Sequence, residues 1–340
     1  MLYAWVKAAV GVLLTVNFAA PLYTVAIERQ LWEEPMAVLA GNLSMSCMCL
    51  GITFVLIGAY DLAQLQVKGL CQSLQYCGFG FGVAFKLAET CMALDQFVAV
   101  LYPLKHFTIM SRARRWLFVG TWLAWAVQPT FGLFAVVFDL QTPADSALGH
   151  DNGTAAYPEC RWESNIAEAY AIFVEAQFLL FSLMTAGLYL YTGVVGYRMN
   201  GRIRKQMAIL GDRGIGGRDR KFVDNFRSFK RIVSVFLMTL TLDVVSPVVR
   251  LTGRWYPMPQ LSGFLHQLRA LCFIFEGWLY GLLNAKLRAA YKKTLCGRFT
   301  RNSVAAQEQN GWLDHQPVPS VAEQVIHQVD IEQLDVAPIE

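Results

Sequence analysis

The 340-residue chain carries little charge. Only 16% of its residues are charged, whereas 55% are hydrophobic, and its mean hydropathy is +0.37. A soluble domain has about 25% charged residues. Charged residues are missing mainly from long apolar runs. A run of about 20 apolar residues can cross a bilayer as a helix. The composition therefore excludes an ordinary soluble protein and predicts an integral membrane protein.

The sequence also lacks the patterns that an enzyme or a transporter would need. Its five histidines are scattered, without acids or cysteines at metal-ligand spacing. The glycine-rich stretch 211–217 follows no predicted strand, which argues against a phosphate-binding loop. Internal repeats with paired broken helices, which are typical of transporters, are not found. We expect no enzymatic activity, no metal, no cofactor and no nucleic-acid partner.

Seven apolar segments are long enough to be candidate spans, at residues 4–27, 36–60, 70–102, 116–138, 166–197, 230–252 and 262–284. Only three residues precede the first segment, and that segment is too long for the apolar core of a cleavable signal peptide. We therefore expect an uncleaved first span and an all-α membrane protein.

The charge of the connecting segments alternates along the chain. Residues 198–231 carry eleven Lys or Arg and three Asp, and segments 105–115 and 286–301 are also basic. The connector 139–168 instead holds six acids against one Arg. Because excess Lys and Arg marks the cytoplasmic side, the amino terminus is predicted to be extracellular. The acidic first connector runs against this bias, but the strongly basic segment 198–231 outweighs it.

The third apolar segment ends in Asp95-Gln96-Phe97, with Pro103-Leu104 shortly after. This stretch resembles the Asp-Arg-Tyr box that ends the third transmembrane helix of rhodopsin-family (class A) G-protein-coupled receptors, although Gln96 stands where the family keeps Arg. The resemblance covers about residues 10–298 and includes a basic, amphipathic stretch at 282–293. It implies a seven-transmembrane helix bundle with an amphipathic eighth helix, and a heterotrimeric G protein as partner. A divergent orphan or fish odorant-like branch is the narrower interpretation.

The resemblance extends to residues in several other spans. Asn42, Trp122 and Pro247 occupy positions that match the family pattern, while Cys47 stands where the family usually has an Asp that binds sodium. Asn17 resembles the asparagine of the family's first helix, and a span kinked at Pro21 whose asparagine bonds to the backbone is the other interpretation. A pairing of Cys71 with Cys160 is similar to the family's disulfide between the third helix and the second extracellular loop. Either Tyr189 or Tyr191 matches the family's tyrosine in the fifth helix. The resemblance also implies a set of switch and G-protein-coupling residues: Asp95, Gln96, Phe97, Arg227, Glu276 and Tyr280.

A ligand pocket is expected in the outer halves of the third, fifth, sixth and seventh spans. Gly78 stands where amine receptors of the family carry an acidic counter-ion, so an amine ligand loses its usual anchor; packing against a neighbouring helix is the other interpretation of this glycine. Glu175 is the carboxylate that could meet a cationic ligand. The candidate lining residues are Gly78, Phe79, Gly82, Glu175, Val248 and Ala270.

Ionisable residues also occur deep inside the predicted spans. Lys86 and Glu89 lie three residues apart, on one face of a helix. Charges in a bilayer either pair or mark function. Asp243 and Glu276 could join them in one intramembrane polar cluster. Both a structural role and a proton-sensitive role fit this composition.

The remaining candidates concern modification and the tail. Asn152-Gly153-Thr154 is a glycosylation sequon in the connector predicted to be outside. Leu287 and Tyr291 give the eighth helix an apolar face for a lipid bilayer, and Cys296 is a palmitoylation candidate. We expect a receptor domain over 1–298 and a disordered cytoplasmic tail over 299–340.

These patterns together predict a multi-pass plasma-membrane receptor. It would bind an unknown extracellular ligand, such as a small odorant or lipid, and signal to a heterotrimeric G protein. A non-signalling seven-helix decoy or scaffold is the alternative, because Gln96, Val245 and Glu276 all stand at switch positions of the family.

Overall fold

The computed structural model describes most of the first 210 residues and short pieces of the later spans. The described residues are 2–65, 67–137, 160, 166–210, 237, 240–241, 243–249, 251–252, 268, 273–274 and 287–294.

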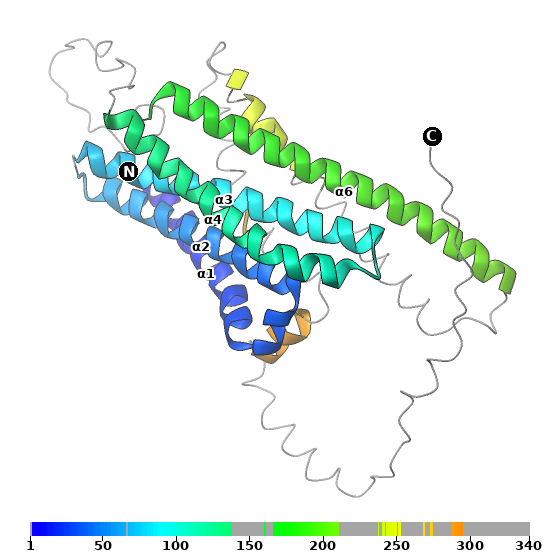
Figure 1. Ribbon diagram of the computed structural model, residues 1–340. Coiled ribbons are helices and arrows are strands. Elements are labelled where there is room, and N and C mark those ends of the chain that lie inside the picture. The colour runs from blue at the N-terminus through cyan, green and yellow to red at the C-terminus, as the bar shows by residue number, and fades with distance from the viewer. Residues whose placement is uncertain are drawn as a thin grey trace, which may run out of the picture. The chain divides into compact units, whose positions relative to one another are not determined.

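Five long helices, each apolar and long enough to cross a membrane, lie in this described part (Figure 1). They are α1 (Leu2–Ile27), α2 (Pro35–Leu62), α3 (Lys68–Leu101), α4 (His106–Val137) and α6 (Glu168–Leu210), with a short 3-10 helix η1 (Arg29–Glu33) between the first two. Lipid offers the backbone no hydrogen-bond partners, so an apolar run satisfies its own groups as a helix. The sixth and seventh predicted spans contribute helical residues 243–249 and 273–274.

The first three predicted spans agree closely with α1, α2 and α3, but the next two are too short. The fourth helix begins at His106 rather than at 116, and the fifth continues to Leu210 rather than ending at 197. In both cases the added turns are polar and basic. Hydropathy therefore marked the part of each helix suited to lipid, whereas the helix itself continues beyond it.

Proline sets two of the helix ends. Pro35 occupies the first turn of α2, where its missing N–H costs no helical hydrogen bond. α3 ends at Leu101, two residues before Pro103, whose ring disfavours helical backbone in the residue before it. These prolines mark the turn that leads into α2 and the turn that follows α3.

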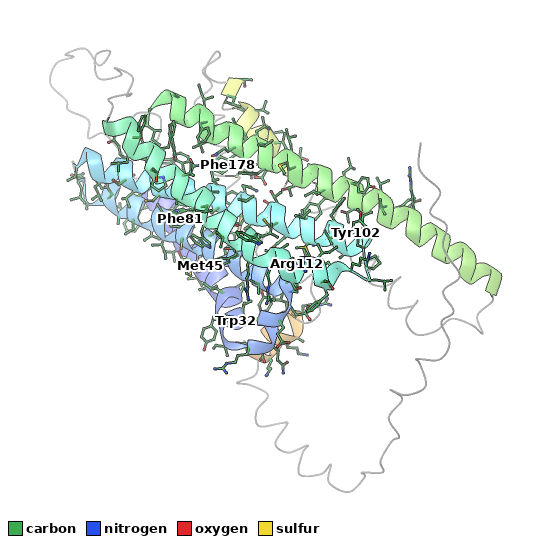
Figure 2. All side chains as sticks on the ribbon, in the orientation of Figure 1. Trp32, Met45, Phe81, Tyr102, Arg112 and Phe178 are labelled. Atoms are coloured by element: carbon green, nitrogen blue, oxygen red, sulfur yellow. A yellow bond between two sulfur atoms is a disulfide. The ribbon has the colours of Figure 1, made fainter. Side chains whose placement is uncertain are left out.

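α3 is the central element, because it packs against α2, α4 and α6. Its Phe85 side chain is completely buried and meets the ring of Phe18 from α1 edge to face, with centroids 6.4 Å apart. On another side of α3, the Phe81 ring stacks on Trp125 of α4 at 5.3 Å (Figure 2). Residues that α3 presents on different faces are therefore positioned by different neighbouring helices.

α1 and α2 approach so closely that their backbones touch through glycines. A Cβ atom added at Gly11 would lie 2.6 Å from both the carbonyl oxygen of Gly51 and the backbone nitrogen of Val55. Such distances are shorter than real Cβ contacts, and the obstructing atoms are backbone atoms that cannot rotate away. Small residues at this crossing allow the dispersion contacts that join helices in lipid.

We predict that Gly11→Ala destabilises the folded receptor by about 1–3 kcal/mol, because the added methyl group forces α1 and α2 apart. Thermal unfolding of the purified protein measures the effect. Gly120→Ala is the matched control, since no atom lies within 4 Å of a Cβ there. An unchanged melting temperature for Gly11→Ala would contradict the close crossing.

Candidate functional site

The predicted disulfide is confirmed. Cys71, in the first turn of α3, is bonded to Cys160 in the connector between α4 and α6, and their Cα atoms are 5.9 Å apart. We call this end of the bundle the disulfide end, and the opposite end, where Asp95 lies, the box end. The amide nitrogen Nε2 of Gln75, one turn along α3, lies 3.3 Å from the sulfur of Cys160.

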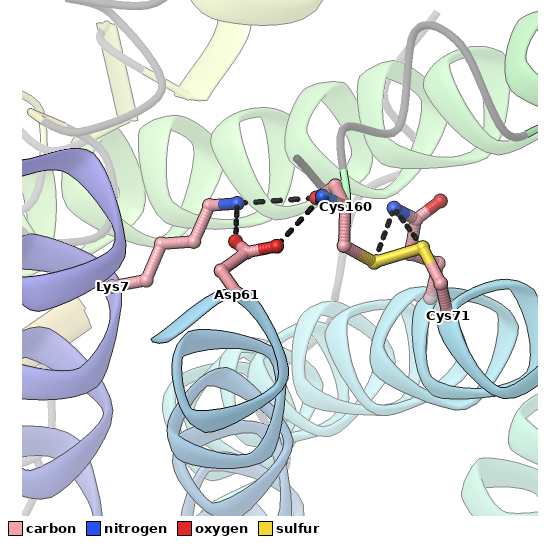
Figure 3. Close-up of polar contacts among 5 residues, drawn as sticks. Lys7, Asp61, Cys71 and Cys160 are labelled. Atoms are coloured by element: carbon pink, nitrogen blue, oxygen red, sulfur yellow. Dashed lines mark hydrogen bonds and ion pairs between the residues drawn. A yellow bond between two sulfur atoms is a disulfide. The ribbon is translucent and has the colours of Figure 1, made fainter. Parts of the chain in front are cut away.

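Beside the disulfide, an ion pair between α1 and α2 holds the same connector (Figure 3). The Lys7 ammonium lies 2.8 Å from Oδ2 of Asp61, and the other carboxylate oxygen accepts the backbone N–H of Cys160 at 2.7 Å. Lys7 also donates to the carbonyl oxygen of Cys160 at 3.1 Å. We call Lys7, Asp61 and Cys160 the outer lock. Together with the disulfide, it fixes the connector to α1, α2 and α3.

Sequence reasoning missed the outer lock, although a signal was present. Lys7 is the only charged residue within α1, and Asp61 is the only one within α2. Isolated charges inside apolar helices usually face a partner. Both lie near the ends that the loop charges placed on one side of the membrane, so a pair could have been considered.

Four of the six candidate lining residues lie on α3 or α6, and two of them, Phe79 and Gly82, contact the facing helix. Phe79 meets the ring of Tyr170 edge to face at 6.2 Å, and a Cβ at Gly82 would lie 3.0 Å from the ring of Phe178. Glu175 is only 2% exposed on α6. Gly78 instead points at α2, where its Cβ would lie 3.1 Å from Cγ2 of Thr53. Its packing interpretation therefore describes it better than a lining role.

The sixth-span candidate Val248 does not join this group either, because 40% of it is exposed. Helical periodicity places it on a different face from Asp243, which is buried. Several sequence candidates lie outside the described residues: Ala270, Arg227, Glu276, Tyr280, Asn152 and Cys296.

In the middle of α3, the structure brings together three of the four predicted intramembrane charges. The Lys86 ammonium is 2.8 Å from Oε2 of Glu89 on its own helix, and it also pairs with Asp243 of the sixth span. All three side chains are at most 2% exposed. We call these three residues the charge cluster. A charge-assisted contact of this kind is strong where water is excluded.

Aromatic and hydroxyl groups complete the surroundings of the charge cluster. The Lys86 ammonium lies 5.3 Å from the centre of the Phe85 ring and 5.0 Å from that of Phe273, within cation–π range. One turn along α3, the Thr90 hydroxyl lies 2.9 Å from the hydroxyl of Thr185 on α6. The cluster therefore joins α3 to the sixth and seventh spans, and a neutral hydrogen bond joins α3 to α6 beside it.

At the box end, Asp95 pairs with a residue that sequence reasoning did not consider. Nε2 of His106 lies 2.9 Å from the Asp95 carboxylate. Asp95 is buried, with its side chain 3% exposed, while His106 is 25% exposed. The chain reverses at Pro103, and this turn brings the first residue of α4 back against α3.

The surface around this pair carries exposed apolar side chains next to the exposed Lys105 and Arg112. Leu104 is 98% exposed and Tyr102 is 54% exposed. Figure 2 shows Tyr102 at the end of α3 and Arg112 in the first turns of α4. The Phe97 ring lies 5.5 Å from that of Tyr191, which is half exposed, whereas Tyr189 is buried. Tyr189 is therefore the inward-facing member of the two tyrosines.

Two asparagines that matched the family pattern join helices through hydrogen bonds. Asn17 of α1 donates to the carbonyl oxygen of Ile274 in the seventh span at 2.5 Å. Asn42 of α2 accepts the indole N–H of Trp122 at 3.0 Å and donates to Thr121 at 3.1 Å. These bonds join α1 to the seventh span and α2 to α4.

The amphipathic stretch after the seventh span is helical over 287–294. Leu287 and Tyr291 share one face, as their spacing predicted, but this face is buried in the protein core rather than left for lipid. Burial raises the pKa of Tyr291 to about 12. Lys293 on the exposed face lies 2.9 Å from Glu28, just before η1. The eighth helix is therefore attached to the first connector as well as to the core.

Comparison with known proteins identifies the architecture. The family model "7 transmembrane receptor (rhodopsin family)" matches residues 20–280, and this family consists of receptors rather than enzymes. Melanopsin of Homo sapiens is 34% identical over 71 residues, and melanopsin of Felis catus is 32% identical over a stretch of the same length. Each match covers 20% of this chain and 15% of the melanopsin.

We predict that Asp61→Ala lowers the stability by about 3–5 kcal/mol, because it leaves a mostly buried ammonium without its carboxylate and the buried N–H of Cys160 without its acceptor. Lys7→Ala should cost less, since the N–H of Cys160 keeps its carboxylate partner. Thermal unfolding in detergent measures both effects.

The control is Glu28→Ala, which breaks the exposed pair with Lys293 and should cost at most about 1 kcal/mol. Equal losses for Asp61→Ala and Glu28→Ala would show that the outer lock contributes no more than a surface ion pair.

Proposed function

Because the chain belongs to the rhodopsin family of seven-transmembrane receptors, we propose that it transmits an extracellular signal to a heterotrimeric G protein in the plasma membrane. The observation that carries this proposal is the box end of α3. There a buried carboxylate is held by the first residue of α4, beside a leucine that is 98% exposed. An apolar side chain so exposed beside basic residues suits a protein partner.

The proposed orientation places the disulfide end outside the cell and the box end in the cytoplasm. The alternation of acidic and basic connectors supports it, as does the Cys71–Cys160 bond, since disulfides persist in oxidising compartments. The glycosylation candidate Asn152 would then be extracellular, and the palmitoylation candidate Cys296 cytoplasmic.

The proposed ligand site lies between the outer halves of α3 and α6. Phe79 and Gly82 face α6 there, and Glu175 contributes a buried carboxylate. Mostly apolar surroundings with few polar groups suit a small apolar ligand, such as an odorant or a lipid. Gly78 packs on α2 and has no carboxylate, so the site lacks the usual anchor for an amine.

The uncharged Gln96 distinguishes this box from that of the family. The family's Arg is thought to hold the receptor off through acids at the box and in the sixth helix. Gln96 can supply only a neutral hydrogen bond, worth about 0.5–1.5 kcal/mol net. Asp95 instead holds His106, which joins α3 to α4 rather than to the sixth span. This change favours signalling without ligand if the protein couples.

The alternative is a non-signalling decoy or scaffold with the same fold. Gln96 favours it if the G protein requires the charge of Arg. The outward-facing Val245, which is 40% exposed and replaces the family's Trp, also favours it. The two functions are separated by whether the protein activates a G protein in cells.

We predict ligand-free G-protein activation by the wild type and a lower level for Gln96→Arg, because the arginine restores the charge of the resting-state contact. Leu104→Ala should reduce activation severalfold at equal surface expression, since it removes the exposed apolar contact. A panel of G-protein dissociation sensors in transfected cells measures each variant.

Leu123→Ala is the matched control, because Leu123 of α4 is 62% exposed but lies within the span. If neither wild type nor Gln96→Arg activates any G protein at normal surface expression, the decoy function is the correct one.

A further inference from the structure

The charge cluster contains one cation with partners on two different elements. Glu89 lies on α3 itself, three residues after Lys86, and its carboxylate is 2.8 Å from the ammonium. Asp243 approaches the same ammonium from the sixth span. One contact is therefore internal to a helix, and the other connects two helices that can move apart.

We propose that Lys86 is a two-position latch. In the resting receptor its ammonium holds the sixth span through Asp243, and when that span moves away from α3 the ammonium remains with Glu89. This inference rests on the proposed receptor function and assigns opposite roles to the two carboxylates. Asp243 stabilises the closed bundle, while Glu89 lowers the free energy of the open one.

The reason for this division is the cost of an unpaired charge in a bilayer. An ammonium without a partner in the membrane interior is strongly unfavourable. If Asp243 were the only carboxylate within reach, separation of the helices would expose Lys86 to that whole cost. Glu89 cannot be left behind, because it lies on the same face of the same helix. The contact to Asp243 can therefore break without isolating the cation.

The other contacts of Lys86 are consistent with a fixed cation and a moving sixth span. The Phe85 ring, 5.3 Å from the ammonium, also lies on α3 and would move with it. Thr90 ties the same part of α3 to Thr185 of α6. Among the residues that the structure describes, the pair with Asp243 is the charged connection of Lys86 to the sixth span.

The test follows the opening of the core without using a G protein. Cys91 of α3 is 5% exposed and belongs to the same buried apolar cluster as Leu240 of the sixth span. Its thiol, which is buried in that cluster, should react with N-ethylmaleimide faster when the cluster opens. The reaction is measured on the full-length protein in lipid nanodiscs, without ligand, by peptide mass mapping that reports Cys91 separately from the other cysteines.

We expect Asp243→Asn to raise the labelling rate of Cys91 about tenfold, a typical size for conformational coupling. Glu89→Gln should lower the rate severalfold, because the ammonium loses its charged partner in the open state. Ligand-free signalling should change in the same directions. Asp243→Glu, which keeps the carboxylate, should restore a rate near that of the wild type.

Thr185→Val is the control, since it removes a neutral hydrogen bond between helices beside the charge cluster. If Thr185→Val raises the labelling rate of Cys91 as much as Asp243→Asn does, the core has loosened in general and the latch is overturned. The latch is also overturned if Asp243→Asn and Glu89→Gln change the labelling rate in the same direction. If the labelling rates change as expected but no variant signals, the latch holds and the proposed receptor function fails.

Discussion

A charged ammonium in the interior of a membrane protein needs carboxylates, and this requirement organises the centre of the bundle. Lys86 is 1% exposed at the middle of α3, the helix that packs against α2, α4 and α6. Its pairing with Asp243 places the sixth span against α3, and the ring of Phe273 brings the seventh span to the same point. The positions of two spans therefore follow from one buried cation.

The two ends of α3 are held by different kinds of contact. At the disulfide end, a covalent bond and the outer lock join α3, α1 and α2 to one connector. At the box end, the Asp95–His106 pair joins α3 only to the start of α4, and His106 is partly exposed to solvent. A bundle anchored in this way resists separation at the disulfide end. Helix movement is therefore expected at the box end, on the side of the charge cluster where Asp95 lies.

Several features followed from the sequence because they depend on composition and spacing. The spans follow from apolar length, and the buried face of the eighth helix follows from the spacing of Leu287 and Tyr291. The Cys71–Cys160 bond followed from the family resemblance rather than from geometry. The true ends of α4 and α6 could not be predicted from hydropathy, because a helix can continue into water when basic side chains cover it.

Choices among partners could not be predicted in the same way. Asp95 had nearby basic residues on both sides, and the turn at Pro103 selects His106. The direction of Gly78 depends on the rotation of α3, which its contacts with three other helices determine. The pairing of Lys7 with Asp61 depends on the crossing of α1 and α2 at their glycines. Each of these is a property of packing between elements, which local sequence patterns do not contain.

The most direct measurement is a double-mutant cycle on thermal stability with Lys86→Met, Asp243→Leu and the combined variant. Each single change leaves a buried charge with fewer partners, whereas the double change removes both members of the pair. If the Lys86–Asp243 pair positions the sixth span, the double variant will be more stable than the sum of the single losses predicts, by more than about 1 kcal/mol. Additive losses would contradict the account, because they would mean that the two residues do not depend on each other.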